Sequence, residues 1–237
     1  MDYFLLFFNA DLVAFIVNET NNYGEVNANS KDLSPKSRIQ SWEKLTCNEF
    51  YVFLALCFLM PHVRKHSIPE YWSQDPLIRT TIFGKCMPRD LFILISRCLH
   101  SADSGKPSLS DPLWKIKYVF SQLKQRFSDV FHLYKKLVID ESLQYIPSKR
   151  HRFGMKLFIL CDCESGIVLD MIVYTGKKTD ISRCGELRLS GEVVKKLMGN
   201  YLGKGHILYT NNYYRSPNLC DFLLKNKTGS CGTVRVN

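Results

Sequence analysis

The spacing of apolar residues changes about half-way along the chain. In the first half, apolar residues recur every three or four positions, as they do on the buried face of an α-helix. The stretch 90–100 shows this most clearly, with a single apolar stripe along it. The period predicts an amino-terminal helix that ends near Asn21 and Asn22, followed by helices over 48–60, 90–100 and 112–131.

Polar residues and prolines mark the ends of these helices. Thr46 and Glu49 are spaced as a capping box, in which a hydroxyl and a carboxylate bind first-turn amides reciprocally. Pro61 ends the helix that follows, because proline lacks the N–H that an interior position donates. Residues 27–38 are polar and rich in turn-forming types, so we expect a linker there.

After residue 136 the apolar period shortens to that of β-strands. Residues 163–166 form a tight-turn sequence, so the strands on either side of it pair as a hairpin. A helix is expected over 191–202, and another begins at Ser216 and Pro217. The predicted strands are 137–141, 156–163, 167–174 and 207–210, with 231–236 as a candidate fifth.

We therefore expect an α/β protein with two regions. Residues 1–132 form a helical region, and residues 133–237 follow the order β-β-β-α-β-α-β of a mixed sheet led by a hairpin. The longest apolar run, 50–60, has 11 residues. A membrane-spanning helix needs about 20, so the pattern predicts no membrane span.

Charge is distributed unevenly. The 237 residues include 32 Lys and Arg against 22 Asp and Glu, a formal charge of +10. Most of the excess lies in 142–237, which hold 15 basic and 7 acidic residues. A basic half suggests a polyanion such as nucleic acid as partner, although ribosomal, membrane-surface and merely soluble proteins share this composition.

The nine cysteines favour reduced thiols over disulfides or a zinc site. They are scattered through apolar segments, and the amino terminus lacks the basic leader of a secretory signal. Cys161 and Cys163 are the one close pair, with a single residue between them. Zinc sites use at least two intervening residues and a second pair.

Candidate chemistry lies where strands end. Asp140 ends the first predicted strand, and Asn211 and Asn212 follow the fourth. Nucleases that cut with two metal ions have this layout, because rigid strand ends hold the converging carboxylates that the ions need. An Asp at a strand end is also a common turn-former, so the layout alone leaves both interpretations open.

Several blocks of residues resemble the piggyBac transposase family, and the resemblance extends over residues 1–237. The most specific are the block around Ile139-Asp140-Glu141 and the block that begins Tyr145-Ile146-Pro147. Further blocks lie at 50–56, 71–77, 189–191, 203–206, 209–214 and 228–235.

The resemblance implies an RNase H-like catalytic core behind a helical dimerisation and DNA-binding region. It implies DNA cleavage and strand transfer at terminal inverted repeats, with excision at TTAA through hairpin ends. Three Asp residues hold two Mg²⁺ ions in this family, and a cysteine-rich zinc domain helps to bind transposon ends. The implied partners are DNA and a second copy of the chain or a related transposase.

The match at the catalytic positions is incomplete. Asp140 corresponds to the family's first catalytic Asp and is the expected metal ligand. The second catalytic Asp corresponds to Asn211, in the block 209–214. The third Asp and the zinc domain are not found in the chain, and a segment that the family carries between Leu143 and Tyr145 is deleted.

Asn211 permits two interpretations. Its side-chain oxygen can still ligate Mg²⁺, but an amide offers one oxygen and no negative charge. We expect Mg²⁺ binding to be lost, which predicts a truncated, degenerate transposase-derived pseudoenzyme that at most binds DNA. The alternative is an active metal-dependent DNA recombinase fragment, completed by missing sequence or by a partner chain.

The basic cluster Lys149, Arg150 and Arg152 is the candidate DNA contact. It also resembles a nuclear import patch, which places the protein in the nucleus, or in the cytoplasm if no import signal works. A solvated loop explains the cluster equally well. Tyr213 and Tyr214 are candidates for stacking on bases, with core packing favoured for one of the two.

Overall fold

A computed structural model gives the fold of the chain. It describes residues 2–103, 105, 108, 110–131, 133–142, 156–182 and 187–234. The chain divides into two compact units, Met1–Phe120 and Ser121–Asn237. In the part of the chain that is described, no helix combines the length and the apolar character that crossing a membrane requires.

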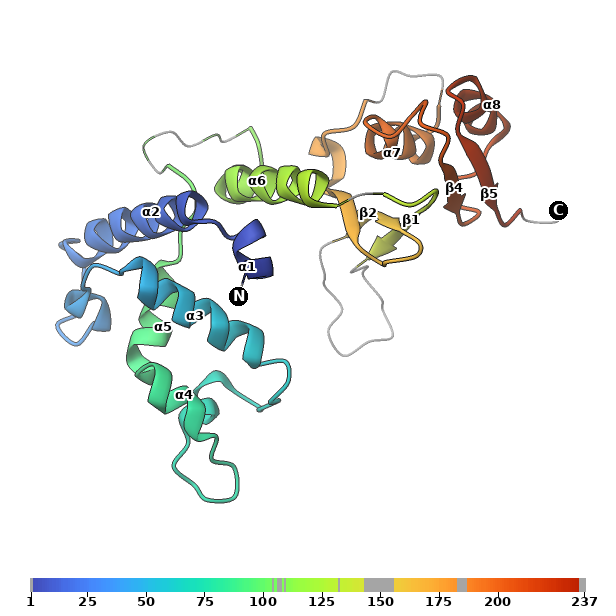
Figure 1. Cartoon of the computed structure of the whole chain (residues 1–237). Helices are drawn as coiled ribbons and strands as arrows, with labels where there is room; N and C mark the ends of the chain where they lie inside the picture. The colour runs from blue at the N-terminus through green and yellow to red at the C-terminus, as the bar shows by residue number, and fades with distance from the viewer. Residues whose placement is uncertain are drawn as a thin grey trace. The chain divides into compact units, whose positions relative to one another are not determined.

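The first unit is helical (Figure 1). Helix α2 packs against α3 and α5, and their apolar faces form the core of the unit. Phe53 of α3 and Phe92 of α5 meet there, with ring centroids 4.9 Å apart. The elements of this unit are α1 (Asp2–Phe7), α2 (Ala10–Ala28), η1 (Arg38–Ser41), α3 (Cys47–Leu59), η2 (Ile68–Trp72), α4 (Thr81–Cys86) and α5 (Arg89–Cys98).

The predicted capping box is confirmed at the start of α3. The Thr46 hydroxyl accepts a hydrogen bond from the backbone N–H of Glu49 at 3.2 Å. In return, the Glu49 carboxylate accepts one from the backbone N–H of Thr46 at 2.9 Å. Two amides of the first turn, which have no partner within a helix, are satisfied in this way.

The predicted end of the first long helix is wrong, because α2 continues past Asn21 and Asn22 to Ala28. Asparagine disfavours helix interiors, since its side chain competes for backbone hydrogen bonds. Here the Asn21 amide bonds instead to the backbone of Leu45, donating to its carbonyl at 3.0 Å and accepting from its N–H at 2.8 Å. A tertiary contact therefore overrides the local preference.

Helix α6 (Trp114–Val130) leads into the second unit, whose centre is a five-stranded mixed sheet. The strand order is β3-β2-β1-β4-β5. Strand β1 is antiparallel to β2 and parallel to β4, β2 is antiparallel to β3, and β4 is parallel to β5. The strands are β1 (Lys136–Ser142), β2 (Leu157–Asp162), β3 (Val168–Val173), β4 (Ile207–Thr210) and β5 (Gly229–Gly232).

The remaining elements of this unit are η3 (Gly176–Lys178), α7 (Leu189–Met198) and α8 (Pro217–Lys225). The predicted order of strands and helices is confirmed. Helix α7 packs on β2 and β3, and α8 lies beside β5 (Figure 1). The core between helices and sheet includes Leu137, Ile139, Phe158, Leu160, Val193, Leu197, Leu208, Leu219 and Leu223.

In the second unit, the clearest differences from the predicted boundaries are at α7 and β5. Helix α7 ends at Met198, four residues earlier than expected, and the turn after it is tied to the end of α8 by a bond from the Gly203 N–H to the Asn226 carbonyl. Strand β5 lies at Gly229–Gly232 where 231–236 was predicted, and the last two residues of that predicted range lie outside the described residues. It is fixed by its partner, because each residue of β4 pairs with one residue of β5.

Candidate functional site

The sheet register brings the two predicted catalytic positions together. In the parallel ladder of β1 and β4, Ile139 pairs with Thr210. Asp140, two residues before the end of β1, and Asn211, directly after β4, are the next residues of the two segments, so they lie side by side at the carboxyl end of this ladder. Ligand and catalytic sites of open α/β sheets commonly form at this edge.

Asn211 turns its amide nitrogen toward the acidic residues. Its Nδ2 donates to Asp140 Oδ1 at 3.1 Å and to Glu141 Oε2 at 3.4 Å. Its Oδ1 accepts from the backbone N–H of Tyr213 at 2.9 Å. An N–H can only donate, so this last bond fixes which end of the amide is the oxygen.

Glu141 belongs to the site although the sequence analysis assigned it no role. Side chains alternate along a strand, so Glu141 shares the core-facing side of β1 with Leu137 and Ile139. Only 7% of its side chain is exposed. The one available signal was its position opposite Phe158 in the β1–β2 ladder, and that requires the register to be known.

Lys156, just ahead of β2, is the second residue that sequence reasoning missed. Its Nζ lies 3.8 Å from Glu141 Oε1. The same ammonium lies 4.9 Å from the centroid of the Phe158 ring and 5.1 Å from that of Tyr213. Aromatic faces attract cations at these distances, so the rings hold the charge beside the carboxylate.

The two tyrosines after Asn211 have different environments, as expected for a pair of which one packs in the core. Tyr214 is fully buried, whereas 47% of Tyr213 is exposed. Burial, and after it the negative charge of Glu141, raises the pKa of both phenols. The Tyr214 hydroxyl lies near Glu141, but it forms no well-shaped hydrogen bond with any of the described residues. Both phenols are therefore neutral at physiological pH.

Comparison with known proteins identifies the fold and the family. The model of a family described as Transposase IS4 matches residues 1–237, the whole chain. The human PiggyBac transposable element-derived protein 2 is 24% identical over 250 residues, which cover 98% of this chain. A solved cryo-EM structure, of a piggyBac transposase synaptic complex with hairpin DNA, matches 99% of this chain with a TM-score of 0.82 and 24% identity. This chain is a member of the piggyBac transposase family.

The predicted fold class is confirmed by this match. The piggyBac transposase structure has the RNase H-like type of catalytic core, and the mixed sheet of Ser121–Asn237 is of that type. The chain spans 39% of the length of the human relative and 50% of the chain in the solved structure.

The donor set at the strand ends does not fit the divalent cation that transposases of this kind use. Mg²⁺ takes oxygen ligands in an octahedron. The oxygen of Asn211 is turned toward the Tyr213 N–H, from which it accepts a hydrogen bond, and its nitrogen faces Asp140, the predicted metal ligand. Within the described ranges, no three His, Cys, Asp or Glu side chains are grouped so that they could hold a metal ion.

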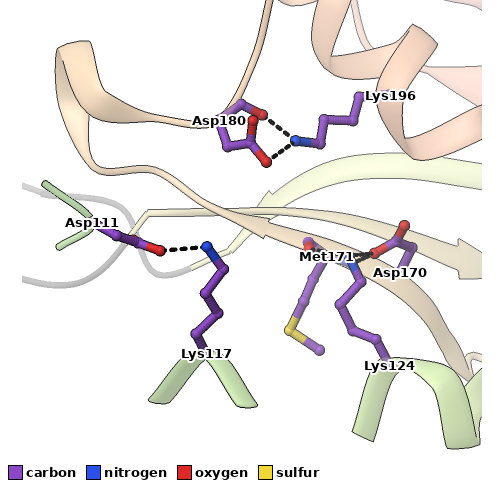
Figure 2. A network of polar contacts seen from close by, with 7 residues as sticks. All are labelled: Asp111, Lys117, Lys124, Asp170, Met171, Asp180 and Lys196. Carbon is purple, nitrogen blue, oxygen red and sulfur yellow. Dashed lines mark hydrogen bonds and ion pairs between the residues drawn. The ribbon is translucent and has the colours of Figure 1, made fainter. Parts of the chain in front are cut away.

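The predicted DNA-contacting residues Lys149, Arg150 and Arg152 lie outside the described residues. Several other lysines of the second unit are engaged with neighbouring groups. Lys124 forms an ion pair with Asp170, and Lys196 forms one with Asp180 (Figure 2). Lys124 also donates to the carbonyl of Met171 at 3.3 Å.

Proposed function

We propose that this piggyBac family member binds DNA without cleaving it or transferring strands. The observation that carries the proposal is the amide at position 211. A phosphodiester is cut by two-metal chemistry when converging carboxylates hold both ions against the attacking and leaving oxygens. Asn211, which lies beside Asp140 directly after the neighbouring strand, brings no charge, and it presents a hydrogen-bond donor where a ligand oxygen is needed.

Binding to DNA is supported by charge and by the family. Residues 142–237 carry more than twice as many basic as acidic residues. The piggyBac transposase of similar fold was solved with hairpin DNA. Contacts from Lys and Arg to phosphates carry no sequence information, so binding by these residues is sequence-independent.

The basic cluster Lys149, Arg150 and Arg152 is proposed to supply part of these contacts, and a salt titration tests this. Each phosphate contact releases counterions, so log affinity for duplex DNA falls by about 0.9 per contact for each log unit of salt. Replacing the three residues together by Ala should weaken binding and reduce the slope by up to about 2.7. The measurement is fluorescence anisotropy of a labelled duplex between low and moderate salt.

A matched control removes the same charge elsewhere. Lys177, Lys178 and Lys225 are exposed lysines of the same unit, and changing them together to Ala should leave the slope nearly unchanged. Equal slopes for the wild type and the basic-cluster variant would assign that cluster to a solvated loop. No binding by the wild type at low salt, or tight binding confined to one inverted-repeat sequence, would contradict the proposed function.

The same cluster is proposed as a nuclear import patch, which places the protein in the nucleus. Import receptors recognise short runs of Lys and Arg, and the cluster has that composition.

A further inference from the structure

Asp140 and Glu141 place two adjacent carboxylates at one end of the sheet, and this arrangement needs a compensating positive charge. Glu141 is almost entirely removed from water, with 7% of its side chain exposed. A buried carboxylate is costly unless a cation or hydrogen-bond donors face it. The question is which groups of this chain supply the compensation.

Besides the Tyr214 hydroxyl, which lies near Glu141 without forming a well-shaped hydrogen bond to any described residue, two side chains face the carboxylates from neighbouring segments. The Asn211 amide bridges them, since its NH₂ group donates to Asp140 Oδ1 at 3.1 Å and to Glu141 Oε2 at 3.4 Å. The Lys156 ammonium lies near the other oxygen of Glu141, at 3.8 Å from Oε1. Both oxygens of Glu141 therefore have a donor or a cation beside them.

Each of these two groups is held in place by a contact of its own. The Tyr213 backbone N–H binds the Asn211 oxygen at 2.9 Å, which keeps the NH₂ group turned toward the carboxylates. The rings of Phe158 and Tyr213 both lie about 5 Å from the Lys156 ammonium. The amide and the ammonium are thus oriented by contacts with other residues of the chain.

We propose that hydrogen bonds from the Asn211 amide and the positive charge of Lys156 together compensate Asp140 and Glu141, so that this end of the sheet folds without a divalent cation. The inference goes beyond the proposed function and does not depend on DNA binding. If the chain folds in this way without a divalent cation but does not bind DNA, the proposed function is overturned and the present inference stands.

The experiment is thermal unfolding of the full chain as wild type, Asn211→Asp and Asn212→Asp. Asn211→Asp adds a third carboxylate about 3 Å from Asp140, where like charges repel strongly. Asn212→Asp makes the same chemical change one residue further along, where no side-chain bond to Asp140 or Glu141 is formed, and is the matched control. Each protein is unfolded in EDTA and in MgCl₂, with KCl added to equal ionic strength.

In EDTA, Asn211→Asp should unfold at least about 3 °C below both the wild type and Asn212→Asp. MgCl₂ should recover most of that loss for Asn211→Asp, because three converging carboxylates bind the cation, and should not shift the other two proteins. A wild type that gains as much from MgCl₂ as Asn211→Asp would overturn the proposal. So would equal midpoints for Asn211→Asp and Asn212→Asp in EDTA.

A second measurement decides the role of Lys156 and does not require Asn211→Asp to fold. Lys156→Met keeps most of the length of the side chain and removes its charge, so it should lower the unfolding midpoint. Adding Glu141→Gln removes the charge that Lys156 compensates, so the double variant should lose clearly less than the two single losses added together. If the two losses in unfolding midpoint simply added in the double variant, Lys156 would not compensate the charge of Glu141.

Discussion

Asn211 and an aspartate at the same position differ by one group, NH₂ in place of an oxygen, yet the two lead to opposite electrostatics. An aspartate beside Asp140 would repel it unless a cation or a shared proton lay between the two carboxyl groups. The amide donates to Asp140 directly, at 3.1 Å, and so satisfies the carboxylate without one. Whether a strand end serves catalysis or merely packs can thus depend on the identity of a single side chain.

The sequence identified part of this site and missed the rest for a physical reason. Asp140 and Asn211 could be predicted because Asp140 lies near the end of one recognisable strand and Asn211 directly follows another, and the ends of parallel neighbours lie together. Glu141 and Lys156 could not, since a Glu next to a candidate ligand and a Lys ahead of a strand are ordinary surface residues by pattern. Their pairing depends on the register between β1 and β2, which no local spacing encodes.

Asp162 offers a test of stability at the residue scale. It is fully buried at the hairpin between β2 and β3. Its Oδ1 accepts from the backbone N–H groups of Glu164 and Ser165 and from the Ser165 hydroxyl, and its Oδ2 accepts from the Tyr134 N–H at 3.1 Å. Burial by itself raises the pKa of this carboxyl, but the hydrogen bonds outweigh it and lower the pKa overall.

The sign of the pH effect follows from that lowered pKa. The stabilisation that the ionised Asp162 carboxylate provides is present above its pKa in the unfolded chain, about 3.9. It is lost as pH falls through the lower pKa that Asp162 has in the folded state. Asp162→Asn should cost about 1–3 kcal/mol at neutral pH, because its NH₂ group would face the Tyr134 N–H. The cost should shrink in acid, as measured by urea unfolding at several pH values.

Glu164→Gln is the matched control for Asp162→Asn. It removes a carboxylate charge from the same turn, at an exposed position, and should change stability little. A cost for Asp162→Asn that is equally large in acid and at neutral pH would contradict the account.

At the scale of elements, α2 shows where local patterns fail. Two adjacent asparagines suggested an end near residue 22, but α2 runs on to Ala28. Asn21 bonds to the backbone of Leu45, and Gly24 lies directly under the indole of Trp42. Both contacts come from segments about 20 residues further along, so periodicity within the helix cannot reveal them. The capping box of α3 was predictable because all its atoms lie within four residues.

Replacing Gly24 of α2 by any residue with a Cβ atom is predicted to destabilise the chain. A Cβ atom at this position would lie 2.2 Å from Cε2 of Trp42, far inside van der Waals contact. Although Ala ordinarily stabilises a helix interior relative to Gly by about 1 kcal/mol, Gly24→Ala should destabilise the chain by about 1–3 kcal/mol. Chemical unfolding followed by tryptophan fluorescence measures the change.

Gly84→Ala in α4 provides the comparison for Gly24→Ala. A Cβ at Gly84 would meet only Cδ1 of Trp72, at 3.8 Å, which is an ordinary contact. This variant should be neutral or stabilised by up to about 1 kcal/mol. A stabilising effect of Gly24→Ala similar to that of Gly84→Ala would show that Trp42 does not pack on α2 as described.

At the scale of the whole molecule, the order of the helices and strands was predictable, whereas the residues at which they begin and end were less so. The change of apolar period near residue 136 separates helices from strands, and the turn at 163–166 identifies the hairpin. The positions of β5 and the end of α7 depend on partners elsewhere in the sheet and in α8. The molecule has the fold of a piggyBac transposase, and we propose that it binds DNA without the cleavage chemistry.

The most direct test is a cleavage assay on a labelled duplex that carries a transposon end with its TTAA site. The full chain is added with Mg²⁺ or Mn²⁺, at concentrations that shift all of the duplex in a native gel. The account predicts complete binding and no nicked, hairpin or joined product on a denaturing gel. A metal-dependent product that disappears in Asp140→Ala and persists in Asp221→Ala, an exposed acid of α8, would contradict it and favour an active recombinase.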